Sequence, residues 1–155
     1  MVTNEPLDWN DFYIRFGRSV FFAQVLERNL ALILCFHEAR KRGVLKRPSP
    51  SEIDALIDEA DGNTIGELLN KLSEFQCFDP TGERLFRDAN ENRRTLVRHF
   101  DFAHHDKFEN LSGVGPACAE VDRLAAPIFE AMYLSKSLAE GEINRMDREN
   151  KSRRA

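Results

Sequence analysis

The stretch from Arg93 to Phe100 places arginine and histidine side chains close together in the pattern of an amphipathic helix. Histidine has an unperturbed pKa close to neutral, so it can gain and lose a proton in solution. Arginine stays charged and binds phosphate through a planar fork of N–H donors. Arg93 and His99 together could therefore supply the chemistry that cuts a phosphodiester without a metal ion.

The helical spacing places these side chains at the edge of the expected core. With Leu96 at the centre of the buried stripe, Arg93 falls to one side and His99 to the other, and Asn92 falls close to His99. Two arginines point to the solvent side, namely Arg94 and Arg98. A cleft or a partner surface would begin at the edge of the core where Arg93 and His99 lie. Asn92 would support this pair of residues. The alternative is that they are boundary residues that cap neighbouring helix ends and reach water.

The same helix, expected from about Glu83 to Ala103, is locally basic. Between Arg84 and Arg98 it carries five arginines against two carboxylates. This local charge predicts an RNA-binding face, on which Arg94 and Arg98 are the solvent-facing candidates. The alternative is a solvated face whose arginines pair with nearby carboxylates. Aromatic residues are not interleaved on this face, so base stacking is not indicated.

Glu27 is a carboxylate on the apolar side of the first expected helix. A charge at such a position should be paired, because burying a lone charge is costly. We expect an ion pair between Glu27 and Arg93. The pair either ties two helices together or orients Arg93 toward a phosphate in a supporting role.

Other site chemistries are not supported by the motifs. His104 and His105 follow His99, but their spacing misses the i,i+4 pattern of helical metal ligands, so no metal site is predicted. The Gly113–Gly115 segment is too short for a phosphate-binding loop and follows no strand. No nucleophile motif is present, and no small-molecule cofactor is indicated.

The composition is that of one globular domain. The chain has 155 residues, of which 42% are hydrophobic and 31% charged, and a net charge of −4. The N-terminal segment lacks the pattern of a secretion signal, and charged and amide residues interrupt the apolar stretch Ser19–Phe36, so no membrane span is predicted. Three distant cysteines indicate reduced thiols in a cytoplasmic protein.

Helix signals dominate the chain and predict an all-α, antiparallel bundle of about five helices. Asp8 can cap a first helix that runs from Trp9 to about Arg42, and capping boxes begin at Ser49 and Thr64. The remaining helices are expected over about 83–103 and from 116, with Pro127 kinking or breaking the last one. Residues 1–140 then form a single domain, and residues 141–155 a charged, flexible tail.

The first expected helix is apolar on two sides. Phe16 and Val20 lie on one face, and the roughly opposite face carries Phe21, Val25, Leu32 and Phe36. One small bundle would struggle to cover both faces. We therefore expect a homodimer, with this helix or the Arg93–His99 edge at the contact.

Two segments resemble a bacterial family of small helical proteins. Phe16–Glu27 reads FGRSVFFAQVLE beside the family's FGRAVxxAQLLE, and Arg93–Asp101 reads RRTLVRHFD beside its RNxLxHHFF. Arg94, Arg98 and Asp101 stand where the family has asparagine, histidine and phenylalanine. The family helix in turn looks like the Arg-x4-6-His helix of the HEPN superfamily.

Active HEPN proteins are metal-independent ribonucleases of toxin and phage-defence systems, whereas many HEPN-like domains only bind partners or dimerise. For an active protein, the resemblance implies that His99 is the general acid or base. It implies that Arg93, or Arg94 in the other register of the motif, stabilises the charge on the phosphate. It also implies that the site forms where two protomers meet. The altered positions Arg94 and Arg98 favour a non-catalytic module that binds a protein partner or a second copy. The alternative is a metal-independent endoribonuclease that uses the Arg-x5-His motif.

Overall fold

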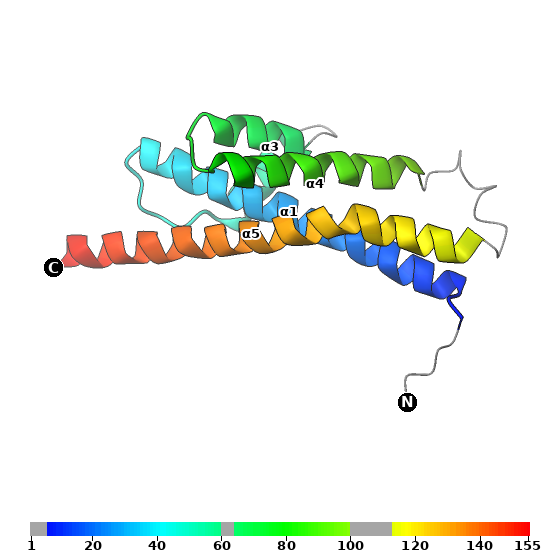
Figure 1. Ribbon diagram of the computed structural model, residues 1–155. Helices are drawn as coiled ribbons and strands as arrows, with labels where there is room; N and C mark the ends of the chain where they lie inside the picture. The colour runs from blue at the N-terminus through cyan, green and yellow to red at the C-terminus, as the bar shows by residue number, and fades with distance from the viewer. Residues whose placement is uncertain (1–5, 60–63, 100–112) are drawn as a thin grey trace.

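The computed structural model describes residues 6–59, 64–99 and 113–155, which contain five α-helices and no strand (Figure 1). The helices are α1 (Trp9–Lys41), α2 (Pro50–Glu59), α3 (Thr64–Ser73), α4 (Pro80–His99) and α5 (Val114–Arg154). The prediction of an all-α bundle of about five helices is confirmed. We expected antiparallel packing, whereas α1 and α5 run in the same direction.

The first helix, α1, begins and ends where its local signals predicted. The side chain of Asp8 accepts a hydrogen bond from the backbone N–H of Asp11, and the Asp11 side chain accepts one from the N–H of Asp8. This reciprocal pair satisfies N–H groups that the first turn leaves free. After Lys41 the chain turns at Gly43, whose φ of +72° suits glycine.

The starts of α2 and α4 also depend on local hydrogen bonds. Ser49 Oγ accepts from the Glu52 N–H at 3.2 Å, and the Glu52 carboxylate accepts from the Ser49 N–H at 3.3 Å, as the capping box predicted. In α4 the Asp79 carboxylate accepts from the Gly82 N–H at 2.6 Å, so the helix begins at Pro80 rather than near residue 83. Proline suits this first position because it has no N–H to leave unpaired.

The longest seam of the molecule joins α1 and α5, which run side by side in the same direction (Figure 1). The Phe22 and Phe129 rings meet edge to face with their centroids 5.0 Å apart. Two turns later, Asn29 Nδ2 donates to Ser135 Oγ at 3.0 Å. A spacing of seven residues between Phe22 and Asn29 keeps one stripe of α1 against its partner helix.

The fourth helix, α4, lies antiparallel to α5, with Gly82 near Leu134 and Asn92 near Leu124. The short helix α3 packs against both α1 and α4. Each of the helices α1 and α4 therefore contacts α5 and α3, and the two occupy opposite corners of the bundle. The largest fully buried side chains come from α1, α3, α4 and α5, and they include Phe36, Phe86, Leu26, Leu30, Leu68 and Leu124.

The last helix is longer than we predicted. It continues through Pro127 without a break and passes Gly141, where we expected a flexible tail to begin. Met146 is fully buried, and Arg47 of the α1–α2 connector holds Asp147 at 2.7 Å. The predicted boundary at residue 141 is therefore wrong, because one apolar anchor and ion pairs from distant residues hold this charged segment against the bundle.

By length and composition alone, α1 is long and apolar enough to span a membrane, but 50% of its most apolar window is buried inside the bundle. A helix that is central in a globular core shows the same combination of length and apolar composition. The place of α1 in the core accounts for its sequence.

Candidate functional site

The candidate catalytic residues lie in the last two turns of α4, where burial follows the predicted stripe. Leu96 is fully buried, Arg93 is half-buried, and Arg94 and Arg98 are exposed. His99 is the last residue of α4, and its side chain lies outside the described residues. Arg93 thus lies at the edge of the core, whereas the geometry of the Arg93–His99 pair stays a prediction.

Asn92 joins α4 to α5. Its Nδ2 atom donates a hydrogen bond to the backbone oxygen of Leu124 at 3.3 Å. This contact limits the rotation of α4 about its axis and so helps to set the direction of the neighbouring Arg93. Asn92 therefore joins α4 to α5 at the residue before Arg93.

The expected ion pair between Glu27 and Arg93 is not formed. Both residues are half-buried, and no ion pair within 4.0 Å joins them. The physical reason is the arrangement of the helices, because α1 and α4 occupy opposite corners and pack mainly against α5. We therefore correct this prediction: the two charges do not compensate each other.

The arginines of α4 fall into two groups. Arg84 lies 4.0 Å from the Asp88 carboxylate, Arg87 lies 3.1 Å from Glu83, and Arg94 lies 3.7 Å from Glu91, each distance joining a nitrogen to a carboxylate oxygen. Within the part of the chain that the structure describes, Arg93 and Arg98 have no carboxylate within 4.0 Å. The carboxylates of the described residues therefore pair with Arg84, Arg87 and Arg94 but not with Arg93 or Arg98.

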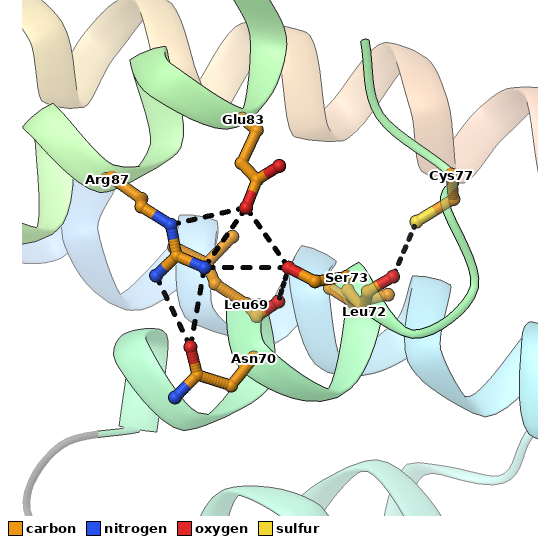
Figure 2. Close-up of polar contacts among 7 residues, drawn as sticks. All are labelled: Leu69, Asn70, Leu72, Ser73, Cys77, Glu83 and Arg87. Carbon is orange, nitrogen blue, oxygen red and sulfur yellow. Dashed lines mark hydrogen bonds and ion pairs between the residues drawn. The ribbon is translucent and has the colours of Figure 1, made fainter. Parts of the chain in front are cut away.

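Arg87 belongs to a polar network that joins α3 to α4 (Figure 2). Its guanidinium donates to Glu83, to the Asn70 side-chain oxygen at 3.3 Å and to Ser73 Oγ at 3.5 Å. Ser73 Oγ in turn donates to the Leu69 carbonyl at 2.8 Å. The first turns of α4 therefore use the charge of Arg87 to join α4 to α3.

Burial disfavours the thiolate form of all three cysteines. Burial raises the pKa of Cys35 to about 11 and also raises the pKa values of Cys77 and Cys118. A thiol whose pKa is raised keeps its proton and reacts slowly. Over residues 6–59, 64–99 and 113–155, no three His, Cys, Asp or Glu side chains gather as metal ligands, and His104 and His105 lie outside these ranges.

A half-buried polar cluster, which sequence reasoning missed, lies in the C-terminal half of the α1–α5 seam. Arg40 forms an ion pair with Glu142, and His37 Nε2 lies 3.7 Å from the same carboxylate. The His37 ring packs over Phe75 with the centroids 5.3 Å apart. Burial lowers the pKa of His37 despite the opposing effect of Glu142. Only the parallel pairing of α1 and α5 brings these residues together, so no local sequence pattern predicts the cluster.

A groove of about 480 Å³ lies at the other end of this seam. It is lined by Asp11, Ile14, Arg15, Arg18, Asp122, Ala126 and Phe129. The Arg18 guanidinium lies over the Phe129 ring, 5.7 Å from its centroid. Two exposed apolar side chains adjoin it: Phe21, which contacts Phe22, and Tyr133, one turn beyond Phe129.

The second apolar face of α1 is therefore divided. Phe36 at its C-terminal end is buried in the core, with 1% of its surface exposed, whereas Phe21 at its N-terminal end is 58% exposed. The bundle covers the half of this face where α2 and α3 pack against α1. The remaining exposed face, formed by Ile14, Arg18, Phe21, Phe129 and Tyr133, is called here the α1–α5 face.

Comparison with known proteins gives no match to a protein-family model, to a curated protein or to a solved structure. The resemblance to HEPN-like proteins therefore stays a prediction.

Proposed function

We propose that this protein is a HEPN-like helical module without catalytic activity of its own, which forms a homodimer through the α1–α5 face. The observation that carries the proposal is the exposure of three large apolar side chains there, with Ile14 at 65%, Phe21 at 58% and Tyr133 at 63%. Apolar residues gathered on one face, rather than scattered singly, are typical of an interaction surface. The three free cysteines fit a cytoplasmic protein.

The α1 part of this face is complementary to itself. At alternating spacings of three and four residues it carries Asp11, Ile14, Arg18, Phe21, Val25 and Arg28. Two copies of α1 placed antiparallel about a twofold axis bring Ile14 of each copy opposite Val25 of the other. They also bring Asp11 opposite Arg28, which holds Asp54 of its own chain at 2.7 Å. Arg18 then lies opposite Phe21, where a cation–π contact can form, and the apolar residues between these pairs face each other. These pairings favour a second copy of the chain as the occupant.

Light scattering coupled to size-exclusion chromatography, over a series of micromolar concentrations, tests the dimer. We expect the mass of two chains for the wild type and of one chain for Phe21→Glu, because a buried unpaired carboxylate opposes association. Val97→Glu is the matched control, since Val97 is an equally exposed aliphatic residue on α4, with 52% of its surface accessible. A wild-type mass of one chain at every concentration would overturn the proposal.

A second candidate function is a metal-independent endoribonuclease. Arg93 and Arg98, which have no ion pair among the described residues and lie on the helix that ends at His99, favour it. In this reaction His99 would transfer a proton to or from a ribose or leaving-group oxygen, and Arg93 would stabilise the negative charge that develops on the phosphate. Arg94 and Arg98 would contact the RNA backbone.

Degradation of RNA in the presence of EDTA separates the two candidates. An active enzyme should lose a factor of about 10²–10⁴ in rate in the His99→Ala variant, and Arg93→Ala should slow the same step. The combined variant should lose less than the product of the two factors, because both residues act on one transition state. Equal cleavage by the wild type and His99→Ala would identify a contaminating nuclease, and no cleavage by either supports the non-catalytic module.

A further inference from the structure

The end of the molecule where α1 and α5 both finish carries a dense group of cations. Lys41 ends α1, and the connector to α2 adds Lys46 and Arg47. The last turns of α5 add Arg145, Arg148, Lys151, Arg153 and Arg154. All of these residues are exposed, and α5 projects at this end of the bundle (Figure 1). We propose that this basic end binds the phosphate backbone of a nucleic acid.

The basic end is a formed surface of the bundle. Met146 is fully buried, which anchors the last turns of α5. Arg47 holds Asp147 at 2.7 Å, and Arg40 of α1 contacts both Glu142 and, at 3.9 Å, Glu149. The connector and the end of α5 are therefore held next to each other, and their positive charges add.

Most of this charge has no local compensation. Residues 41–49 and 141–155 contain nine Lys and Arg residues and three carboxylates, in a chain whose net charge is −4. Each of the three carboxylates already forms an ion pair: Glu142 with Arg40, Asp147 with Arg47 and Glu149 with Arg145. Arg42 shares a groove with Glu38, Glu52 and Glu59. Among the described residues, six cations at this end have no ion pair: Lys41, Lys46, Arg148, Lys151, Arg153 and Arg154.

The chemistry of this surface fits a polyanionic backbone. Arg148, Lys151 and Arg154 follow each other at one-turn intervals, each about 4.5 Å further along α5, and so offer a row of cations to a row of phosphates. Residues 41–49 and 141–155 contain no aromatic side chain on which a base could stack. They also lack the broad apolar face with which an amphipathic helix enters a membrane. Binding should therefore be electrostatic and independent of nucleotide sequence.

This inference does not depend on the dimer or on the α4 motif. Asn92, near the end of α4, contacts Leu124 in the first half of α5, so Arg93 and Arg98 lie toward the opposite end of the bundle. The two basic regions can be tested separately.

The test measures fluorescence anisotropy of labelled 25-nucleotide single-stranded RNA and duplex DNA, of unrelated sequences, at several salt concentrations. The wild type should bind all of them, and log K should fall steeply with log salt concentration. The variant Arg148→Gln/Lys151→Gln/Arg154→Gln should reduce the steepness of this slope for duplex DNA by about 2–3, if each cation contacts one phosphate. The variant Arg84→Gln/Arg123→Gln/Lys136→Gln removes the same charge from exposed positions outside both basic regions and is the matched control, with circular dichroism checking the fold of both.

Three outcomes would overturn the proposal. The wild type could fail to bind nucleic acid at low salt, or the α5 variant could bind with unchanged affinity and salt slope. The third is binding to vesicles of phosphatidylserine and phosphatidylcholine, lost in the α5 variant, without binding to RNA or DNA. That outcome would assign the basic end to a membrane surface.

Discussion

At the residue scale, Arg84 and Arg87 show how differently two arginines on one helix are used. Arg87 bonds residues of α3, whereas Arg84 is 85% exposed and only approaches Asp88 on its own helix. We expect Arg87→Ala to lower the free energy of unfolding by about 0.5–1.5 kcal/mol, a modest loss because the group is partly solvated. Arg84→Ala should change it by less than about 0.5 kcal/mol. Urea titration of both variants checks this, and equal losses would remove the structural role of the network in Figure 2.

His37 should make stability depend on pH. Burial lowers its pKa from the ordinary value of 6.5 in the folded protein, while Glu142 opposes and Arg40 and Arg145 reinforce the effect. Below pH 6.5 the unfolded chain takes up a proton that the folded protein resists, so the free energy of unfolding falls as the pH falls. This contribution is present above pH 6.5 and is lost through the window between that value and the lowered pKa.

The measurement is urea unfolding of the wild type and His37→Gln at several pH values between neutral and mildly acidic. The difference in free energy of unfolding between the two proteins should change by less than about 1.4 kcal/mol for each pH unit. The wild type should lose more stability on acidification. The remaining histidines are common to both proteins and cancel in this difference. Parallel pH profiles for the two proteins would show that His37 is not responsible.

At the scale of the element, the question is whether the last turns of α5 pack on the bundle or form a loose tail. Met146 is fully buried, so Met146→Ala should cost about 2–5 kcal/mol of unfolding free energy through lost packing. Asn144→Ala, an exposed position in the same turn, should change stability by less than about 0.5 kcal/mol. Thermal or urea unfolding measures both. Equal stabilities would mean that residues 141–154 do not pack on the bundle.

The beginnings of the helices were predictable from sequence because a cap acts over three or four residues. The Asp8–Asp11 and Ser49–Glu52 bonds form where their residue types indicated. The start of α4 was placed about one turn late, because Asp79-Pro80-Thr81-Gly82 also describes a turn. In the structure Asp79 caps the helix.

At the scale of the whole molecule, α1 and α5 are distant in sequence and form the central seam. We expect the slowest amide hydrogen exchange in residues 26–36 of α1 and 124–132 of α5, where buried positions are densest. Exchange should be faster in α2, where Ile53 is the one buried residue of the helix. Mass spectrometry of exchanged peptides measures this order. Protection of α2 that equals or exceeds that of the seam would contradict it.

The amino-acid sequence by itself determined the all-α class, the starts of α1 and α2 and the orientation of Arg93, Leu96, Arg94 and Arg98 around α4, because helical periodicity and caps are local. The tertiary structure decided which helices are neighbours. It separated Glu27 from Arg93, and it left Phe21 exposed while burying Phe36. It also held the charged end of α5 beside the α1–α2 connector through Asp147 and Met146. These outcomes depend on contacts between residues about 100 positions apart, and local spacing carries no information about such distances.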